Sequence, residues 1–218
     1  MKIGVFGTGA VGNALGSKLA QLGHEVKMGA RAAGNGKAVA WVNAAGPKAS
    51  QGTFADAATF GELLLNCTAG AASLAALQAA GAKNMAGKIL IDVANPLDFS
   101  RGMPPTLTVC NNDSLGEQIQ RAFPETKVVK ALNTVSNPVM VNPGLVPGEH
   151  DLLICGNDAG AKSQVTELLR TFGWKTVVDV GDITVARGTE GYLLLWVRLF
   201  GHLQTPLFNV HVVHVVVR

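Results

Sequence analysis

Residues 3–12, Ile-Gly-Val-Phe-Gly-Thr-Gly-Ala-Val-Gly, decide the fold of this 218-residue chain. The apolar run Ile3–Phe6 predicts a strand, and the glycines after it have the spacing Gly-x-Gly-x-x-Gly. Gly7 permits a tight turn, Gly9 lets the backbone approach a pyrophosphate, and Gly12 lets a helix pack closely on the strand. The N-terminus of that helix offers unpaired N–H groups and a partial positive charge to phosphate. The stretch therefore predicts a dinucleotide-binding strand, turn and helix.

The residues that follow fit this interpretation. Leu15, Leu19 and Leu22 form one stripe of an amphipathic helix that should end at Gly23, and residues 24–28 should form a second strand. A strand, a glycine turn, a helix and a second strand in this order are the context that the glycine spacing requires. An unrelated glycine turn is the less favoured alternative.

The end of the second strand indicates the type of dinucleotide. NAD-binding chains usually carry Asp or Glu about 20 residues beyond the glycines, and NADP-binding chains have a basic residue instead. No acidic residue lies between Glu25 and Asp56. Arg31 offers a planar fork of donors to a phosphate, Lys37 a mobile charge, and Thr8 a hydroxyl group. We therefore expect NADP(H), although a solvated surface charge is the alternative for Arg31.

Composition limits the class of protein. With 218 residues and 48% hydrophobic content, the chain can bury one large domain, or one large and one small domain. The net charge of +3 is mild and is not gathered with aromatic residues, so we expect no nucleic-acid partner. No signal peptide and no membrane-spanning run is visible, and we expect no membrane association. The three cysteines are widely spaced, which argues against disulfides and zinc and favours the reducing cytoplasm.

Strand and helix patterns alternate along the chain, which predicts an α/β fold: a doubly wound, mostly parallel sheet with a small C-terminal helical part. Further strands are expected at 62–67, 88–94, 127–132, 151–155 and 176–180. Helices are expected at 36–45, 71–80, 114–123, 159–172 and 184–202, the third of them beginning with a Ser-x-x-Glu capping box at Ser114. We place a domain boundary near Asp182, between a dinucleotide-binding domain at 1–182 and a C-terminal helix and tail at 183–218.

The sequence contains no arrangement of side chains that predicts a catalytic or metal site. No nucleophile, histidine and acid are suitably spaced, and we expect no catalytic residue and no metal. His211 and His214 should face opposite sides of an alternating strand in the apolar tail 210–217. That tail and the preceding helix predict a homodimer interface or an edge strand, with burial within the chain as the alternative. Arg187 and Glu190 could form an ion pair at the domain junction or at the surface.

Five segments together carry a resemblance to a known family. They are residues 7–12, the Asp-Val-Ala-Asn-Pro-Leu segment at 92–97, residues 113–117, the Val-Val-Lys-Ala-Leu-Asn-Thr segment at 128–134, and residues 186–190. With these segments the chain resembles the NADP oxidoreductase, coenzyme F-420-dependent family over its whole length. The resemblance implies a Rossmann domain that binds NADP, a small helical C-terminal part, and a deazaflavin or flavin held between them. The oxidoreductase domain of membrane metalloreductases looks similar.

The resemblance also implies which residues bind the ligands. By matching position, the ribose phosphate would lie against Thr8, Ala30, Arg31 and Lys37, the pyrophosphate against Gly9, Ala10 and Val11, and the nicotinamide beside Thr68 and Ala69. Asn95 and Pro96 would form the floor of the cleft or serve only as a structural turn. The hydride acceptor would meet the nicotinamide at Asn133, Thr134 and Val135. One departure is the small Cys-Thr-Ala-Gly loop at 67–70, where the archaeal enzymes have an Ile-Pro-Trp type segment.

Three functions fit these features. The first is hydride transfer between NADPH and a small acceptor such as F-420 or a flavin, a reaction that needs positioning more than proton transfer. The second is an imine or carbonyl reductase, which would need an acid such as Tyr192 or Asp182 beside the nicotinamide. The third is an NADP(H)-binding redox sensor. A flat apolar slot would favour the first, a pocket with an acid the second, and a blocked slot the third.

Overall fold

The fold is built on one twisted sheet, seen in a computed structural model that describes residues 1–215. Among these residues the sheet has eight strands in the order β10-β9-β8-β5-β4-β1-β2-β3. Their bounds are β1 (Lys2–Phe6), β2 (Glu25–Ala30), β3 (Ala49–Thr53), β4 (Leu63–Asn66), β5 (Ile89–Asp92), β8 (Lys127–Ala131), β9 (Asp151–Gly156) and β10 (Thr176–Asp179). All neighbours run parallel except β8 and β9, which are antiparallel. The predicted α/β fold with a mostly parallel sheet is confirmed.

Helices cover both faces of the sheet. They are α1 (Ala10–Gln21), α2 (Gly36–Ala45), α3 (Phe54–Phe60), α4 (Gly70–Ala80), α5 (Ala82–Met85), α6 (Leu115–Ala122), α7 (Asn137–Val141), α8 (Ala159–Thr171) and α9 (Ala186–Leu203), with short 3-10 turns η1 (Pro143–Leu145) and η2 (Ile183–Val185). One apolar cluster joins α1, α2, α7 and α8 to the sheet, and the other joins α3, α4, α5 and α6. Side chains that alternate along each strand divide between these two clusters, as buried parallel strands require.

The chain reverses direction across the sheet between β1 and β4. After β1 it builds β2 and β3 on one side, then returns to pair β4 with the other edge of β1. The chain therefore leaves β1 at Gly7 and β4 at Cys67 in different directions, because α1 and α4 pack on opposite faces of the sheet. Ligands of open α/β sheets bind at such a switch point.

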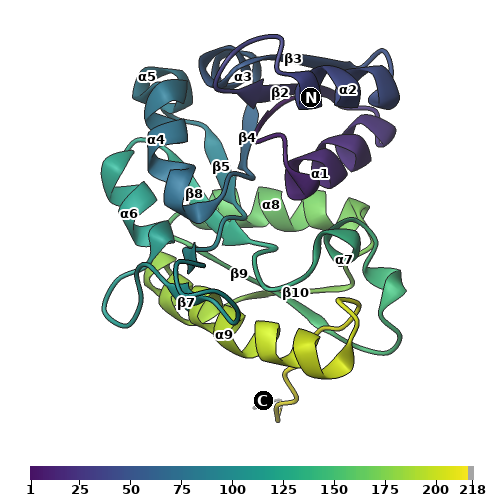
Figure 1. The fold of residues 1–218 in the computed structure, drawn as a ribbon, viewed down its shortest axis with the longest axis vertical. Coiled ribbons are helices and arrows are strands. Elements are labelled where there is room, and N and C mark those ends of the chain that lie inside the picture. Colours follow the sequence, from purple (N-terminus) through teal and green to yellow (C-terminus); the bar gives the residue numbers. More distant parts are fainter. Residues whose placement is uncertain (216–218) are drawn as a thin grey trace.

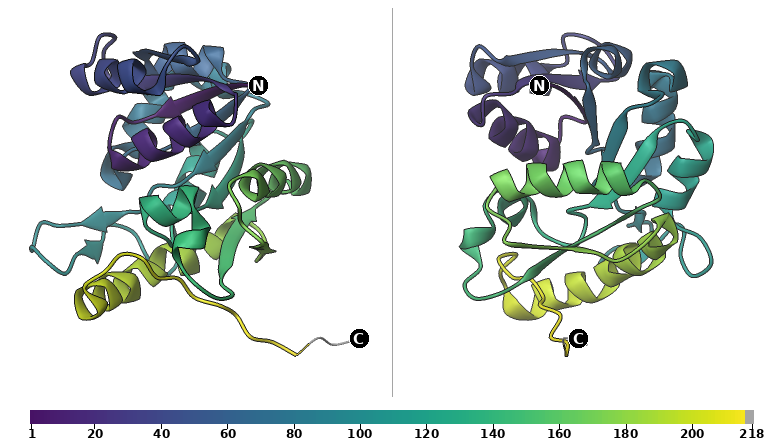
Figure 2. Two further views of the ribbon diagram at one scale, coloured as in Figure 1. Left: turned by 90° about the vertical axis from the view of Figure 1, so that its right-hand side faces the viewer. Right: turned by 180° about the vertical axis from the view of Figure 1, so that it is seen from behind.

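The C-terminal helix lies at the opposite end of the molecule from β1, β2 and β3 (Figure 1). A small hairpin, β6 (Leu97–Asp98) with β7 (Thr106–Leu107), rises from the long connection after β5. The hairpin and the C-terminal half of α9 project from the same side of the molecule (Figure 2, left). Among residues 1–215, no helix combines the length and the apolar character that crossing a membrane requires.

The sequence prediction missed β3 and α3. β3 is one of the two edge strands of the sheet. It contains Ser50, Gln51 and Gly52, and only Gly52 is buried, so it lacks the apolar run that marked the other strands. α3 begins at a capping box in which the Thr53 hydroxyl accepts from the Asp56 N–H and the Asp56 carboxylate accepts from the Thr53 N–H. The expected box at Ser114 is only half present, because the Glu117 carboxylate binds the Ser114 hydroxyl and Arg187 instead of the Ser114 N–H.

The C-terminal tail is not the alternating strand that the sequence suggested. Residues 204–215 contain neither helix nor strand, and residues 216 and 217 of the expected segment lie outside the described residues. The tail is tied to Asp151, whose N–H donates to Val210 O (2.9 Å) and whose carboxylate accepts from the Val212 N–H and contacts His211. Only the first of these contacts is between backbone groups, and the others use the Asp151 side chain, so no backbone ladder forms. Within residues 1–215 no cluster of ligands suits a metal ion, and the homodimer stays a prediction.

The expected pairing of Arg187 with Glu190 is wrong, because both side chains reach across to other elements. The Arg187 guanidinium donates to the Glu117 carboxylate of α6 (2.9 Å), and Glu190 pairs with Lys130 of β8 (2.7 Å). Both contacts join α9 to the sheet domain. The boundary proposed near residue 182 is therefore bridged by charged contacts on α9.

Replacing Glu117 with Gln tests the first of these contacts. Hydrogen bonds from Arg187 lower the pKa of Glu117, so its stabilisation is present above the ordinary carboxyl pKa and is lost as the pH falls. Because the Arg187 side chain is 40% exposed, we expect the change to cost only about 1 kcal/mol at pH 7. Urea unfolding of both proteins at pH 7 and pH 4 should show this difference shrinking at the lower pH. A difference that grows towards pH 4 would contradict the assignment.

Candidate cofactor and acceptor site

Two adjoining cavities and a groove open at the carboxyl edge of the sheet. The first cavity, about 610 Å³, is called the Arg31 cavity and runs from the glycine turn to Arg31 and α4. The second, about 580 Å³, is called the Trp196 cleft and runs between the ends of β4, β5 and β8 and α9. Cys67, Thr68 and Ala69 line both of them. The Lys37 groove, about 520 Å³, lies on the other side of Thr8 and Gly9.

The geometry of the glycine turn fits a bound pyrophosphate. Gly7 has φ +113°, in the region that favours glycine, and its N–H donates to Gly29 O (3.1 Å). A Cβ on Gly12 would lie 2.1 Å from Gly7 O, whereas a Cβ on Gly9 would meet nothing within 4 Å. No side chain caps α1, and its first turn contains no acidic residue. The first amides of α1 therefore face open space, where an anion can approach.

The Arg31 cavity has the charge that an added phosphate requires. Arg31 follows β2 directly, it is exposed, and among the described residues it makes no ion pair. Among residues 1–215, no Asp or Glu lines this cavity. Asp56, the nearest acid after Arg31 in the sequence, is engaged with Thr53 through hydrogen bonds of 2.8 and 2.7 Å.

The sequence-predicted residues divide between the cavities as follows. Gly7, Thr8, Gly9, Ala30, Arg31, Thr68 and Ala69 line the Arg31 cavity, Ala10 and Lys37 the groove, and Val11, Asn95, Asn133 and Val135 the Trp196 cleft. Thr134 is buried and Gly12 packs on the turn, and neither lines any of the three spaces. Pro96 does not line the cleft either, and its carbonyl accepts from the Thr108 N–H (2.8 Å).

Several lining residues were not predicted. The Arg31 cavity also contains Asn35, which caps α2, together with Phe54 and the alanine face of α4. Leu193, Trp196 and Phe200 of α9 form the outer wall of the Trp196 cleft. The Trp196 ring stacks on the rings of Phe200 (5.6 Å between centroids) and Phe208 (5.2 Å). The spacing of three and four residues along α9 places its three side chains on one face, a signal that the sequence offered.

The Trp196 cleft contains no acid that could transfer a proton. No Asp or Glu of the part of the chain that the structure describes lines it. Asp182 is exposed and accepts hydrogen bonds from Thr184 at the start of η2. The Tyr192 hydroxyl is buried, its pKa is raised by that burial, and Tyr192 lines neither cavity. Burial, with the charge of Asp92, also raises the pKa of Cys67, which keeps this thiol protonated.

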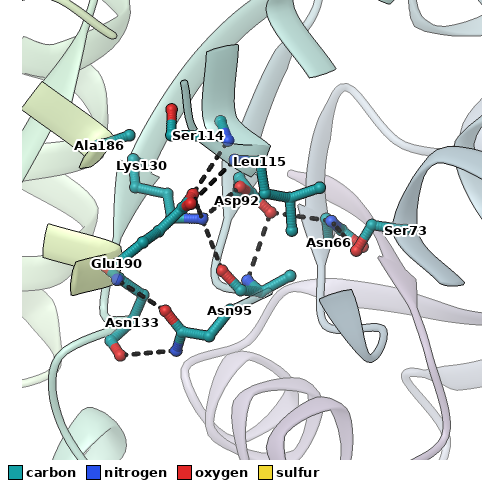
Figure 3. A network of polar contacts seen from close by, with 12 residues as sticks. Asn66, Ser73, Asp92, Asn95, Ser114, Leu115, Lys130, Asn133, Ala186 and Glu190 are labelled. Carbon is teal, nitrogen blue, oxygen red and sulfur yellow. Dashed lines mark hydrogen bonds and ion pairs between the residues drawn. The ribbon is translucent and has the colours of Figure 1, made fainter. Parts of the chain in front are cut away.

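A buried charge network lies between the cleft and α9 (Figure 3). The Lys130 ammonium, fully buried, contacts the carboxylates of Asp92 and Glu190 at 2.7 Å each and donates to Ala94 O. Burial alone would lower the pKa of Lys130, but the two carboxylates raise it above its ordinary value. Glu190 also accepts from the N–H groups of Leu115 (2.8 Å) and Gly116 (3.0 Å) at the start of α6.

The network reaches the cavities through Asn66. Its amide donates to Asp92 (2.8 Å), and its oxygen accepts from the Thr68 hydroxyl (2.7 Å). Thr68 lines both cavities, and the Ala94 carbonyl held by Lys130 belongs to the floor of the cleft. The network thus fixes the residues at the ends of β4 and β5. Its signal in the sequence was a lysine and an aspartate within otherwise apolar strands.

Comparisons with known proteins identify the family of the chain. Residues 2–96 match the family model described as NADP oxidoreductase coenzyme F420-dependent. A solved protein from Arthrobacter sp. FB24, provisionally described as an F420-dependent NADP reductase, is 52% identical, with 98% of this chain and 100% of that chain covered and a TM-score of 0.95. This chain belongs to the F420-dependent NADP oxidoreductase family.

Two curated relatives are less similar to this chain than the Arthrobacter protein is. Metalloreductase STEAP3 of Rattus norvegicus is 31% identical over 87% of this chain and 36% of its own length. The F420-dependent NADP reductase of Methanocaldococcus jannaschii is 30% identical over 54% of this chain and 52% of its own length. The chain thus spans about a third and about half of the lengths of these relatives.

The fold extends beyond the family. A reductive aminase from Aspergillus terreus, solved with NADPH and ethyl-5-oxohexanoate, is 18% identical and has a TM-score of 0.67, with 93% of this chain and 62% of that chain covered. At this identity the similarity concerns the fold alone.

Proposed function

We propose that this chain transfers hydride between NADPH and a planar acceptor, a deazaflavin such as F-420 or a flavin. The observation that carries this proposal is the pairing of an acid-free Arg31 cavity with an acid-free, largely apolar Trp196 cleft. The cavities meet at Thr68 and Ala69, which is where a nicotinamide shared between them would lie. Membership of the family supports the same choice of cofactor.

Each part of NADP has a proposed place. The 2′-phosphate binds between Arg31, Thr8 and Lys37, which lie around the end of β2 and the glycine turn. The pyrophosphate binds at Gly9, Ala10 and Val11, where the α1 amides are free of side-chain caps. The adenine lies along the alanine face of α4, which gives it apolar contact.

The chain contributes position rather than proton transfer. Reduced NADP supplies the hydride, and the protein holds two flat rings at contact distance. Asn95, Asn133 and Val135 form one wall of the acceptor site, and the stacked ring of Trp196 forms the other. The family resemblance placed Thr134 against the acceptor. Its side chain is buried and does not line the cleft, so we assign no side-chain contact with the acceptor to Thr134.

A reductase of imines or carbonyls is the weaker alternative. Such a reaction needs a proton donor beside the substrate, and neither Asp182 nor Tyr192 lines the cleft. A sensor without turnover would have a blocked slot, whereas the Trp196 cleft encloses about 580 Å³. We also propose a reducing, cytoplasmic setting, because Cys67, Cys110 and Cys155 are all free thiols.

A substrate screen tests the proposed reaction. We expect NADPH oxidation, followed in a stopped-flow instrument without oxygen, to be fast with F-420 or a flavin and slow with ferric chelates and cyclic imines. NADH at the same concentration serves as the control donor and should react much more slowly. Oxidation with cyclic imines alone would replace the proposal with the reductase alternative, and binding of NADPH without any turnover would favour the sensor.

A further inference from the structure

Two asparagines at the floor of the Trp196 cleft fix each other's orientation. The Asn133 amide nitrogen donates to Asn95 Oδ1 (2.9 Å), and the Asn95 amide nitrogen donates to the Asn133 carbonyl (2.8 Å) (Figure 3). The Asn133 amide nitrogen also donates to the Thr189 carbonyl (3.0 Å). A backbone carbonyl can only accept a hydrogen bond. The carbonyls of Thr189 and Asn133 therefore determine which end of each side-chain amide is the nitrogen.

This arrangement leaves one strong acceptor without a partner. Asn133 is 2% exposed, and its Oδ1 is buried with no hydrogen bond among the described residues. A buried polar atom without a partner costs about 1–3 kcal/mol, and such atoms are rare enough in folded proteins to need a reason. Asn133 lines the cleft, so a ligand in the cleft is the natural source of the missing donor.

A second unpartnered atom belongs to another residue of the same cleft and has the opposite polarity. The indole N–H of Trp196 is buried and donates to nothing among residues 1–215. Two residues of the cleft thus each hold a buried atom without a partner among residues 1–215, the acceptor Asn133 Oδ1 and the donor Trp196 Nε1. An amide group carries the complementary pair, an N–H donor and a carbonyl acceptor.

We propose that the Trp196 cleft selects ligands that carry an amide, with Asn133 Oδ1 accepting a hydrogen bond from the amide N–H. Asn95 is a positioning residue, because it holds the Asn133 side chain in the orientation that presents Oδ1. This inference rests on the proposed function, which supplies two sources of such an amide: the carboxamide of the nicotinamide and the ring amide of a deazaflavin or flavin. A site built to hydrogen-bond an N–H rejects the analogue that lacks it, because the acceptor is then left unpaired.

Two pairs of ligands distinguish the nicotinamide carboxamide from the ring amide of the acceptor. Within each pair, one ligand carries the amide N–H and the other lacks it. The first pair is NADP⁺ and its 3-acetylpyridine analogue, in which a methyl group replaces the carboxamide nitrogen. The second is FMN and N3-methyl-FMN, in which the ring N–H is blocked. Dissociation constants are measured by calorimetry for the first pair and by flavin fluorescence for the second, on the wild type and on Asn133→Ala. We expect the wild type to favour the N–H ligand about tenfold in at least one pair, and Asn133→Ala to favour it less than about twofold.

Both ligands of a pair bind the same variant, so general structural damage from the substitution affects both dissociation constants alike. The ratio of the two constants therefore reports only the contact with the amide N–H. Asn95→Ala keeps the acceptor Asn133 Oδ1 but removes the contact that orients the Asn133 side chain. It should therefore weaken the preference for the N–H ligand without abolishing binding. This variant replaces Asn133→Ala in the test if Asn133→Ala does not fold. Asn142→Ala, an exposed asparagine at the end of α7, should leave the ratio unchanged. Equal affinities within both pairs for the wild type, or full discrimination retained in Asn133→Ala, would overturn the inference. Failure of NADPH to bind or to be oxidised would instead count against the proposed function.

Discussion

Replacing Lys130 with Met is expected to lower the free energy of unfolding by about 3–5 kcal/mol. Lys130 is the cation between Asp92 and Glu190, and all three side chains are buried. Met fills a similar volume, so the loss comes chiefly from two carboxylates left without their partner. Because the pKa of Lys130 is raised in the fold, its stabilisation is present below the ordinary lysine pKa and is lost as the pH rises beyond it. Urea unfolding at pH 7 measures the effect.

The chain offers a matched control on the same strand. Lys127 begins β8, its side chain is 46% exposed, and it pairs with Asp158 at 3.1 Å. An exposed pair contributes little, so Lys127→Met should cost less than about 1 kcal/mol. Equal losses for the two substitutions would show that the buried network does not hold α9 and the strand ends together.

Replacing Arg31 with Glu is expected to weaken NADPH binding by at least about tenfold and to leave NADH binding nearly unchanged. Arg31 lies in a cavity without acidic residues, next to the proposed position of the 2′-phosphate. The substitution replaces an attraction for that phosphate with a repulsion, whereas NADH has only hydroxyl groups there. Fluorescence titration with both dinucleotides gives the two affinities.

Arg170→Glu provides the control for net charge. Arg170 is exposed in the last turn of α8 and lines neither cavity. It should change the affinities for NADPH and NADH by similar, small factors. If Arg31→Glu weakened both dinucleotides equally, the assignment of Arg31 to the phosphate would be wrong.

The sequence was sufficient for the parts of the fold that local chemistry determines. The glycine spacing at 7–12 and the apolar strands predicted the parallel sheet, because buried parallel strands read as continuous apolar runs. The same logic failed for β3, which is a polar edge strand. It failed again for the tail at 204–215, where alternating valines suggested a strand but contacts with Asp151 determine the conformation.

The site was predictable on the cofactor side and less so on the acceptor side. Arg31 and the glycine turn lie beside each other because strand order alone brings them together. Trp196 enters the cleft from α9, more than a hundred residues beyond the ends of β4 and β5 in the sequence, and no local pattern encodes that docking. The partners of Lys130 and Glu190, and the free oxygen of Asn133, likewise depend on tertiary contacts between β8 and α9.

Calorimetric titration of the wild-type protein with NADPH and with NADH tests the central claim most directly, since the whole account depends on a 2′-phosphorylated dinucleotide at the carboxyl edge of β1 and β2. The account predicts one NADPH per chain, bound at least about tenfold more tightly than NADH. Equal affinities for the two dinucleotides, or no heat of binding with either, would contradict it.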